Sequence, residues 1–432
     1  MLDIQFIRAN PSLVELKAKQ KGYDVDVTRL LELDDKRRTL QGQLDEIRRQ
    51  RNTNSDLSTG TKPSQQEQAM GRQLKQQLLE LDELYKKTEL DYYQLLKTVP
   101  NLPLDDVAVG ASEDENVIAK TVGEKPQFDF PIKSHHELGE SRGLIDKTRA
   151  AKIAGSRFAY LKGDLVRLEF ALINFVINQL TNRDLIAKLI TDNKLDITSQ
   201  PFIPVIPPAM LKTAPYQASS RLNAEEDTYK IEQDDLWLNA SAEHTLCTMY
   251  MDEIIAEQEL PIRFIGFSTS FRREAGSYGR DMEGILRLHQ FDKLEMEVLS
   301  TAETGLAEHK LLIAIQEYLV SQLELPYQLI EKCTADIGKP NARGTDINTW
   351  FPSQQTYRET HTADYITDYQ ARGLKIRVRR EDNKVELVHN NDATAFALGR
   401  ILAAIMENYQ TADGNIRIPT VLVPYMGQQA QI

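Results

Sequence analysis

Residues 263–297 constrain the fold of this chain of 432 residues more than any other stretch. Two runs rich in β-branched and aromatic residues, 263–274 and 285–297, flank a segment with three glycines. This pattern predicts a long antiparallel hairpin. Because side chains alternate between the two faces of a strand, Leu286, Leu288, Leu294 and Met296 would share one face. We therefore expect that face of the hairpin to pack in a core.

The opposite face of the predicted hairpin collects charges. Arg272 and Glu274 share that face on the first strand, and the second strand adds Arg287, His289, Phe291, Lys293 and Glu295. Covering so many fixed charges with a core is costly, so we expect this face to meet a polar ligand. The alternative is a surface hairpin whose charges pair with one another.

The hairpin also resembles a known motif. Residues 271–281 read Phe-Arg-Arg-Glu-Ala-Gly-Ser-Tyr-Gly-Arg-Asp, and residues 287–295 read Arg-Leu-His-Gln-Phe-Asp-Lys-Leu-Glu. Both segments are similar to motif 2 of the class II aminoacyl-tRNA synthetases, in the form typical of seryl-tRNA synthetases. The resemblance implies an α+β fold, with a class II antiparallel sheet flanked by helices and preceded by an antiparallel α-helical coiled-coil arm.

Length, cysteines and charge limit the alternatives. The length favours two or three domains. The two cysteines, Cys247 and Cys333, are far apart and in no metal-ligand spacing, which suits a reducing cytoplasm and argues against a structural zinc site. No apolar run approaches the roughly 18 residues of a membrane span, and the N-terminus does not read as a signal peptide. A net charge of −12 argues against indiscriminate binding of nucleic acid, but not against a local basic patch.

Residues 27–99 predict a separate helical arm. The first helix begins near residue 27, and its apolar seam at Leu33, Leu40, Leu44 and Ile47 is broken by Arg37 and Arg51. The second helix spans about 65–98 with an unbroken 4-3 seam at Leu74, Leu78, Leu81, Tyr85, Thr88, Tyr92, Leu95 and Val99. Residues 52–64 have the composition of a turn. Two such helices predict an antiparallel coiled-coil hairpin.

Basic side chains gather on the first helix of the arm: Lys36, Arg37, Arg38, Arg48, Arg49 and Arg51. On its own, such a run can be only a solvated face. The resemblance to the N-terminal arm of bacterial seryl-tRNA synthetases implies that these arginines bind tRNA(Ser), and tRNA(Sec) if the organism has one. We place the N-terminal domain at 1–110 and the catalytic domain at 111–432.

Two further segments resemble motifs 1 and 3 of the class II fold. Motif 1 covers about 163–208, with a helix over 163–190 and a strand at 202–208 that prolines cut short. It implies a homodimer interface, although an ordinary core helix and edge strand fit the sequence equally. Motif 3 covers about 392–409, where Arg400 precedes a helical run over 401–409.

Residues 236–244 predict a strand that enters a helix through the polar segment Ser241-Ala242-Glu243. Alone, this segment is a common helix cap. The resemblance implies that serine is bound by Ser241, Ala242, Glu243, Arg272, Glu295 and Thr394. In that site Glu243 and Glu295 would supply anions for the ammonium, while Arg272 would supply a bidentate donor.

The resemblance also implies an ATP site with Arg272 and Arg400 as catalytic residues. Its contacts to ATP would come from Arg272, Arg273, Glu274, Arg287, Phe291, Glu359, Thr360, His361, Thr362 and Arg400. Phe291 and Arg400 would stack on the two faces of adenine, and Glu359 and Thr362 would bind Mg²⁺. Thr360, His361, residues 363–366 and Asp392 depart from the family's pattern, so the sequence leaves their effect on metal binding and serine specificity open.

We therefore expect a cytoplasmic enzyme that joins serine to ATP as seryl-adenylate and transfers the seryl group to tRNA. One alternative is a ligase that charges a carrier protein, but such a protein would lack the long basic arm. Another is an inactive RNA-binding scaffold, which would have no need of the charged residues Arg272, Glu274, Glu295, Glu359 and Arg400 together.

Overall fold

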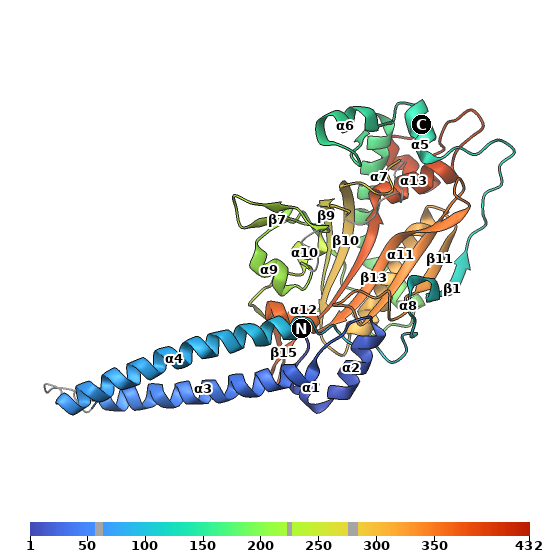
Figure 1. The fold of residues 1–432 in the computed structure, drawn as a ribbon. Helices are drawn as coiled ribbons and strands as arrows, with labels where there is room; N and C mark the ends of the chain where they lie inside the picture. The colour runs from blue at the N-terminus through green and yellow to red at the C-terminus, as the bar shows by residue number, and fades with distance from the viewer. Residues whose placement is uncertain (57–63, 223–226, 275–283) are drawn as a thin grey trace. The chain divides into compact units, whose positions relative to one another are not determined.

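The computed structural model describes residues 1–56, 64–222, 227–274 and 284–432 (Figure 1). The chain divides into two compact units, Met1–Leu102 and Pro103–Ile432. The predicted domain boundary near residue 110 stays a prediction. Among the described residues, no helix is both long enough and apolar enough to cross a membrane.

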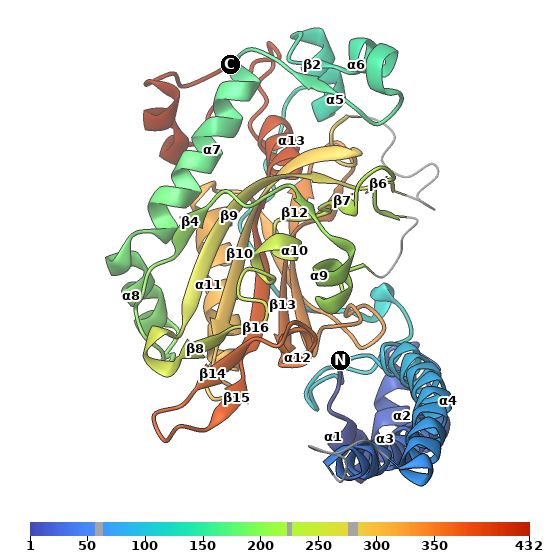
Figure 2. The same cartoon turned by 90° about the vertical axis from the view of Figure 1, so that its left-hand side faces the viewer.

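The N-terminal unit is helical, with α1 (Ile4–Ala9), α2 (Pro11–Gln20), α3 (Val27–Asp56) and α4 (Gln65–Leu96). Helices α3 and α4 lie side by side along their length (Figures 1 and 2). Their buried seam contains Leu33, Leu40, Leu44, Leu74, Thr88 and Tyr92. The predicted coiled-coil arm is therefore confirmed. The predicted turn at 52–64 was too long, because α3 continues to Asp56; residues 57–63 lie outside the described residues.

Arg37 does not break the seam of the arm as its charge suggested. Its guanidinium lies 4.7 Å from the centre of the Tyr92 ring, and its Nη2 donates to Asp34 Oδ1 at 2.9 Å. Asp34 is buried and also accepts from Arg8 at 2.7 Å. A buried charge is tolerated when it is paired and hydrogen-bonded, so this cluster joins the packing between the helices.

The C-terminal unit is built on an eight-stranded sheet with the order β1-β11-β12-β13-β16-β10-β9-β4. The strands are β1 (Val117–Val122), β4 (Ile203–Val205), β9 (Ile262–Phe271), β10 (Gln290–Ser300), β11 (Tyr327–Glu331), β12 (Arg343–Phe351), β13 (Thr356–Thr367) and β16 (His389–Ala397). All neighbouring strands are antiparallel except β4 and β9, which are parallel. The predicted antiparallel sheet is confirmed.

Helices α7 (Asp164–Leu180), α8 (Arg183–Asp192), α11 (Gly305–Gln322) and α13 (Leu398–Asn408) share one apolar core with the sheet. Leu294, Met296 and Val298 of β10 lie in this core and are fully buried, which confirms the predicted apolar face of the hairpin. The side chains that alternate with them face the other way and remain available for a site.

Smaller elements complete the unit. The helices are α5 (His135–Ser141), α6 (Lys147–Ala154), α9 (Thr213–Ala218), α10 (Glu243–Leu246) and α12 (Tyr369–Leu374). The short strands are β2 (Ile145–Asp146), β3 (Tyr160–Leu161), β5 (Met210–Leu211), β6 (Lys230–Ile231), β7 (Leu236–Leu238), β8 (Ile254–Ala256), β14 (Arg377–Arg379) and β15 (Val385–Leu387). Strand β7 leads into α10, as the sequence predicted, and α10 packs on β9 and β10 (Figure 2).

Three predicted boundaries were wrong. The hairpin strands are shorter, because β9 ends at Phe271 and β10 begins opposite it at Gln290, so residues 272–274 and 285–289 lie beyond the strands. The predicted helix over 163–190 is two helices, since the Asn182 side chain accepts from two backbone N–H groups and caps α8. Arg400 lies inside the first turn of α13 rather than before it.

Candidate active site

A pocket opens where β10, β13 and β16 meet the first turn of α13. It contains about 680 Å³ of space free of atoms, part of it open to solvent. Its wall includes Phe291 and the polar residues Arg272, Glu274, Arg287, Lys293, Glu359, Thr360, Thr362, Thr394 and Arg400. The fold therefore brings together residues that lie more than a hundred positions apart in the sequence.

The arginines of the pocket are held in place by partners on its wall. The Arg272 guanidinium lies 5.3 Å from the centre of the Phe291 ring, and its Nε donates to the Ala240 carbonyl at 3.1 Å. Arg287 Nη1 donates to Glu274 Oε2 at 2.9 Å. Such fixed cations suit a polyanionic ligand, because little further ordering is required when it binds.

Glu359 and Arg400 form a second ion pair at the pocket. Arg400 Nη1 donates to Glu359 Oε1 at 3.0 Å and to the Glu359 carbonyl at 2.7 Å. Burial acts to raise the pKa of Glu359, but Arg400 and Lys332 outweigh it and hold the pKa below its ordinary value. Glu359 is therefore a carboxylate at neutral pH, and Thr362 adds a hydroxyl oxygen to the same wall.

Six predicted site residues do not line the pocket, and Arg273, His361 and Ala242 are three of them. The exposed Arg273 lies with its guanidinium 5.9 Å from the centre of the Tyr229 ring. His361 is buried against Phe396, and burial lowers its pKa to about 3, which keeps the imidazole neutral. Ala242 is buried in a second apolar cluster with Leu246. The position of His361 gives no support to the predicted contact with ATP.

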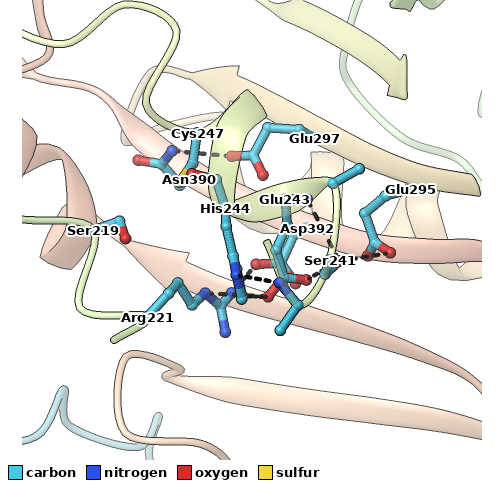
Figure 3. A network of polar contacts seen from close by, with 12 residues as sticks. Ser219, Arg221, Ser241, Glu243, His244, Cys247, Glu295, Glu297, Asn390 and Asp392 are labelled. Atoms are coloured by element: carbon cyan, nitrogen blue, oxygen red, sulfur yellow. Dashed lines mark hydrogen bonds and ion pairs between the residues drawn. The ribbon is translucent and has the colours of Figure 1, made fainter. Parts of the chain in front are cut away.

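The remaining predicted serine ligands form a buried group behind the pocket, which we call the acidic nest: Ser241, Glu243 and Glu295 (Figure 3). Ser241 Oγ lies 3.3 Å from Glu243 Oε2 and 3.5 Å from Glu295 Oε2. Burial raises the pKa of Glu295 to about 7, although Lys293 acts against this. Burial also acts to raise the pKa of Glu243, but Arg221, His244 and Lys293 together outweigh it and hold that pKa well below its ordinary value.

Two cations hold the nest, and the sequence assigned a role to neither. Lys293 Nζ lies 2.5 Å from Glu295 Oε2, 3.2 Å from Ser241 Oγ and 4.0 Å from Glu243 Oε2. Arg221 pairs through its Nη2 with Asp392 Oδ2, and its Nε lies 3.3 Å from Glu243 Oε1 (Figure 3).

Only one of these two residues left a signal in the sequence. The alternation along β10 placed Lys293 on the same face as Glu295. Arg221 follows α9 in a segment with no motif, so only the fold shows that it is buried. Asp392 departs from the family's pattern, and in the structure its carboxylate pairs with Arg221.

Comparisons with known proteins cover both units. Residues 1–103 match the family described as "Seryl-tRNA synthetase N-terminal domain", and residues 228–409 match "tRNA synthetase class II core domain (G, H, P, S and T)". A serine–tRNA ligase of Syntrophotalea carbinolica is 38% identical over 432 residues, covering 99% of this chain and 98% of that protein. A serine–tRNA ligase of Exiguobacterium sibiricum is 37% identical over 434 residues, with 99% and 98% covered.

A solved structure is similar over the same length. The seryl-tRNA synthetase from Pyrococcus horikoshii, complexed with ATP, superposes with a TM-score of 0.86 at 34% identity. The match covers 100% of this chain and 99% of that one. Sequence and fold therefore agree across the arm and the sheet.

Proposed function

The chain belongs to the seryl-tRNA synthetase family, and we propose that its pocket and acidic nest join L-serine to ATP and that its arm presents tRNA(Ser) for transfer. One observation carries this proposal: a pocket lined by arginines adjoins a buried pair of carboxylates, with Lys293 and Arg272 between them. A triphosphate fits the first part, and an ammonium fits the second.

Serine would be recognised in the nest. Its ammonium would bind Glu243 and Glu295. The Glu295 Oε1 atom is buried and has no hydrogen-bond donor among the described residues. An unsatisfied buried acceptor costs free energy, so a ligand that donates to it binds more tightly. Arg272 would hold the serine carboxylate and Thr394 its hydroxyl. A site that hydrogen-bonds the hydroxyl rejects alanine strongly, on the order of 10⁴-fold.

The first reaction forms a bond between a serine carboxylate oxygen and the α-phosphorus of ATP. The bond from that phosphorus to pyrophosphate breaks, and the electron pair leaves with pyrophosphate. Arg272 would stabilise the charge that grows on the non-bridging oxygens, which is worth roughly 10²- to 10³-fold in rate. Phe291 and Arg400 would hold adenine between them. Transfer to the tRNA hydroxyl then releases AMP.

Magnesium fits the oxygen donors beside the phosphate site. The Glu359 carboxylate is half exposed at the pocket, and Thr362 contributes a hydroxyl to the same wall. Hard oxygen ligands of this kind suit Mg²⁺, which usually keeps several waters and binds through one or two carboxylates and the substrate's phosphates. Glu359 and Thr362 would hold the ion, which would neutralise phosphate charge.

The arm supports the proposed binding of tRNA. Arg38, Arg48, Arg49 and Arg51 are exposed on α3, and Arg48 and Arg49 pair there with Asp45 and Glu46, whereas Arg37 is engaged with the buried Asp34 and with Tyr92. We assign phosphate contacts to the four exposed arginines, because clustered exposed cations release counterions when they bind RNA. The same surface would serve tRNA(Sec) if the organism has one, and the cytoplasm would be the place of action.

A homodimer through motif 1 is supported by exposed apolar side chains. Phe170 on α7 is 58% exposed, and Ile203 and Ile206 at β4 are 47% and 85% exposed. Large apolar groups gathered at the edge of a sheet favour an interface, and β4 is the edge strand here.

The test is ATP–pyrophosphate exchange with serine, threonine, alanine or cysteine as the amino acid. We expect exchange with serine alone, lost in Arg272→Ala and kept in Arg379→Ala, which removes an exposed arginine on β14. Circular dichroism and gel filtration would show that each variant is folded and keeps its oligomeric state. Folded wild-type protein that exchanges with no amino acid would refute the adenylation proposal.

A further inference from the structure

The acidic nest already contains an ammonium group, and it belongs to the protein. Lys293 Nζ contacts Glu295 Oε2 at 2.5 Å and Ser241 Oγ at 3.2 Å, and it lies 4.0 Å from Glu243 Oε2. Glu243 and Glu295 are the two carboxylates that we assign to the substrate's ammonium. A lysine ammonium and an amino-acid ammonium have the same charge and the same three donors.

The path into the nest also passes Lys293. Lys293 belongs to the wall of the ATP pocket, whereas Ser241, Glu243 and Glu295 are buried behind that wall. The exposed fractions of Ser241 and Glu295 are 0%. A substrate that arrives through the pocket therefore reaches these groups only when the lysine side chain moves.

Of the two cations in the nest, Lys293 is the one that can move. Arg221 is paired with Asp392 and lies 3.3 Å from Glu243, so carboxylates from two different elements hold its guanidinium. Lysine carries a point charge on a flexible four-carbon stem, so its ammonium can change position without moving the backbone. Strand β10 is paired on both sides, with β9 and β16, and keeps the Lys293 backbone fixed.

We propose that Lys293 is an exchangeable counter-ion: its ammonium fills the nest before serine arrives and swings into the ATP pocket when the serine ammonium replaces it. The nest keeps the same charge throughout the exchange. The pocket gains one positive charge beside Arg272, where the triphosphate adds negative charge. The inference rests on the proposed function, and it makes Lys293 a residue that couples the two substrates.

Such an exchange has a thermodynamic signature. ATP attracts the lysine into the pocket and so frees the nest, which makes serine bind more tightly, and the effect is reciprocal. If Lys293 fills the nest for about nine-tenths of the time, the apparent affinity for serine is reduced about tenfold. Removing the ammonium should therefore strengthen serine binding in the absence of nucleotide. A residue with a merely structural role would not have this effect.

The test is isothermal titration of serine into wild type, Lys293→Met and Lys293→Arg, with and without α,β-methylene-ATP, which cannot form the adenylate. Lys384→Met serves as the matched control, because the Lys384 side chain is 72% exposed. The titrations are run at pH 8.5, so that loss of Lys293 does not leave Glu295 largely protonated; its pKa is about 7 with the lysine in place.

We expect the nucleotide analogue to strengthen serine binding in wild type and in Lys384→Met. In Lys293→Met, serine alone should bind about tenfold more tightly than in wild type, and the analogue should have no further effect. Lys293→Arg keeps a competing cation and should keep the coupling. Weaker or unchanged serine binding in folded Lys293→Met, or coupling equal to that of wild type, would overturn the exchange.

Failure of the proposed function looks different. In that case wild type shows no serine-dependent ATP–pyrophosphate exchange and binds no serine. Ethanolamine, which has the ammonium and the hydroxyl but no carboxylate, then probes the nest alone. Tighter binding of ethanolamine to Lys293→Met than to wild type supports the exchange, and equal or weaker binding refutes it.

Discussion

The buried pair of Arg221 and Asp392 offers the sharpest test of how the nest is held. The Arg221 side chain is 12% exposed and that of Asp392 is 1%, so solvent screens their interaction little. One carboxylate oxygen from each of Glu243, Glu295 and Asp392 lies within 4.8 Å of the other two. In Arg221→Gln, the Asp392 carboxylate would face the two glutamates without its arginine partner. Lys293 would then be the one cation facing three carboxylates in this group. Removing one partner of a buried pair lowers the free energy of unfolding by about 3–5 kcal/mol.

The double variant Arg221→Gln/Asp392→Asn should recover most of that loss. It removes both charges and keeps groups that can hydrogen-bond, and Glu243 retains Lys293 and His244 as neighbours. We expect the double variant to lose about 1 kcal/mol, the size of one weakened hydrogen bond. The coupling energy between the two sites should then be at least about 2 kcal/mol.

Tryptophan fluorescence during urea unfolding suits this measurement. The two tryptophans, Trp237 and Trp350, both lie in the C-terminal unit, so the signal reports the unit that contains the site. The single variant should also depend on pH. Burial and neighbouring carboxylates raise the pKa of Asp392 well above its ordinary value although Arg221 lowers it, so losing Arg221 raises that pKa further.

Without Arg221, the folded protein therefore binds a proton on Asp392 at a higher pH than the unfolded chain does. The stability of Arg221→Gln should rise as the pH falls from 8 to 6, by up to about 1.4 kcal/mol per pH unit. Two results would refute this account of the nest. The double variant could lose as much stability as the two single variants together, or the stability of Arg221→Gln could stay the same as the pH changes.

Three further outcomes follow from the site. Because burial raises the pKa of Glu295 to about 7, the KM for serine should increase up to about tenfold per pH unit below 7, and Glu295→Gln should abolish that dependence and have a high KM at every pH. Phe291→Ala should raise the KM for ATP about 2- to 13-fold through lost stacking, with the KM for serine changed less. Replacing Arg49 and Arg51 with Gln should weaken tRNA binding and reduce its salt slope by about 1 per charge removed, while ATP–pyrophosphate exchange stays the same.

Periodicity was enough to predict the large elements of the fold. The 4-3 seam of α4 and the alternation in β10 both depend on which side chains can be buried together, and each extends over enough residues to be read from the sequence. The ends of the elements were harder to predict. Asn182 caps a new helix inside the predicted helix over 163–190, and the strands of the hairpin separate where Arg273 N–H turns to the Asp227 carbonyl. Each of these ends depends on one or two local hydrogen bonds, which leave no periodic pattern.

The residues of the site also include some that the sequence could predict and some that it could not. Residues on the charged face of β10 were predictable because their spacing fixes their direction, and Glu295 and Phe291 were found for that reason. Arg221 could not be predicted, because its role arises from contacts with Glu243 and Asp392, which lie on other elements. The predicted contact of His361 with ATP rested on the resemblance and stays a prediction, although the side chain is buried against Phe396. The register of β12 and β13 shifts between Ile347 and Asn348, opposite residues 359–361, so strict alternation does not hold along β13 there.

The placement of the nest explains why this sheet can hold so much charge. Leu294, Met296 and Val298 of β10 are buried in the core, which fixes the strand whatever the opposite face carries. Lys293, Glu295 and Glu297 alternate with them and are buried as well. Ordering the strand at the moment of binding would cost free energy, whereas here the folding of the apolar face has already fixed the backbone that carries these charges. The same strand therefore stabilises the unit through one face and, in the proposed function, positions serine through the other. Substitutions on the charged face should consequently change substrate binding more than substitutions of equal size at exposed positions.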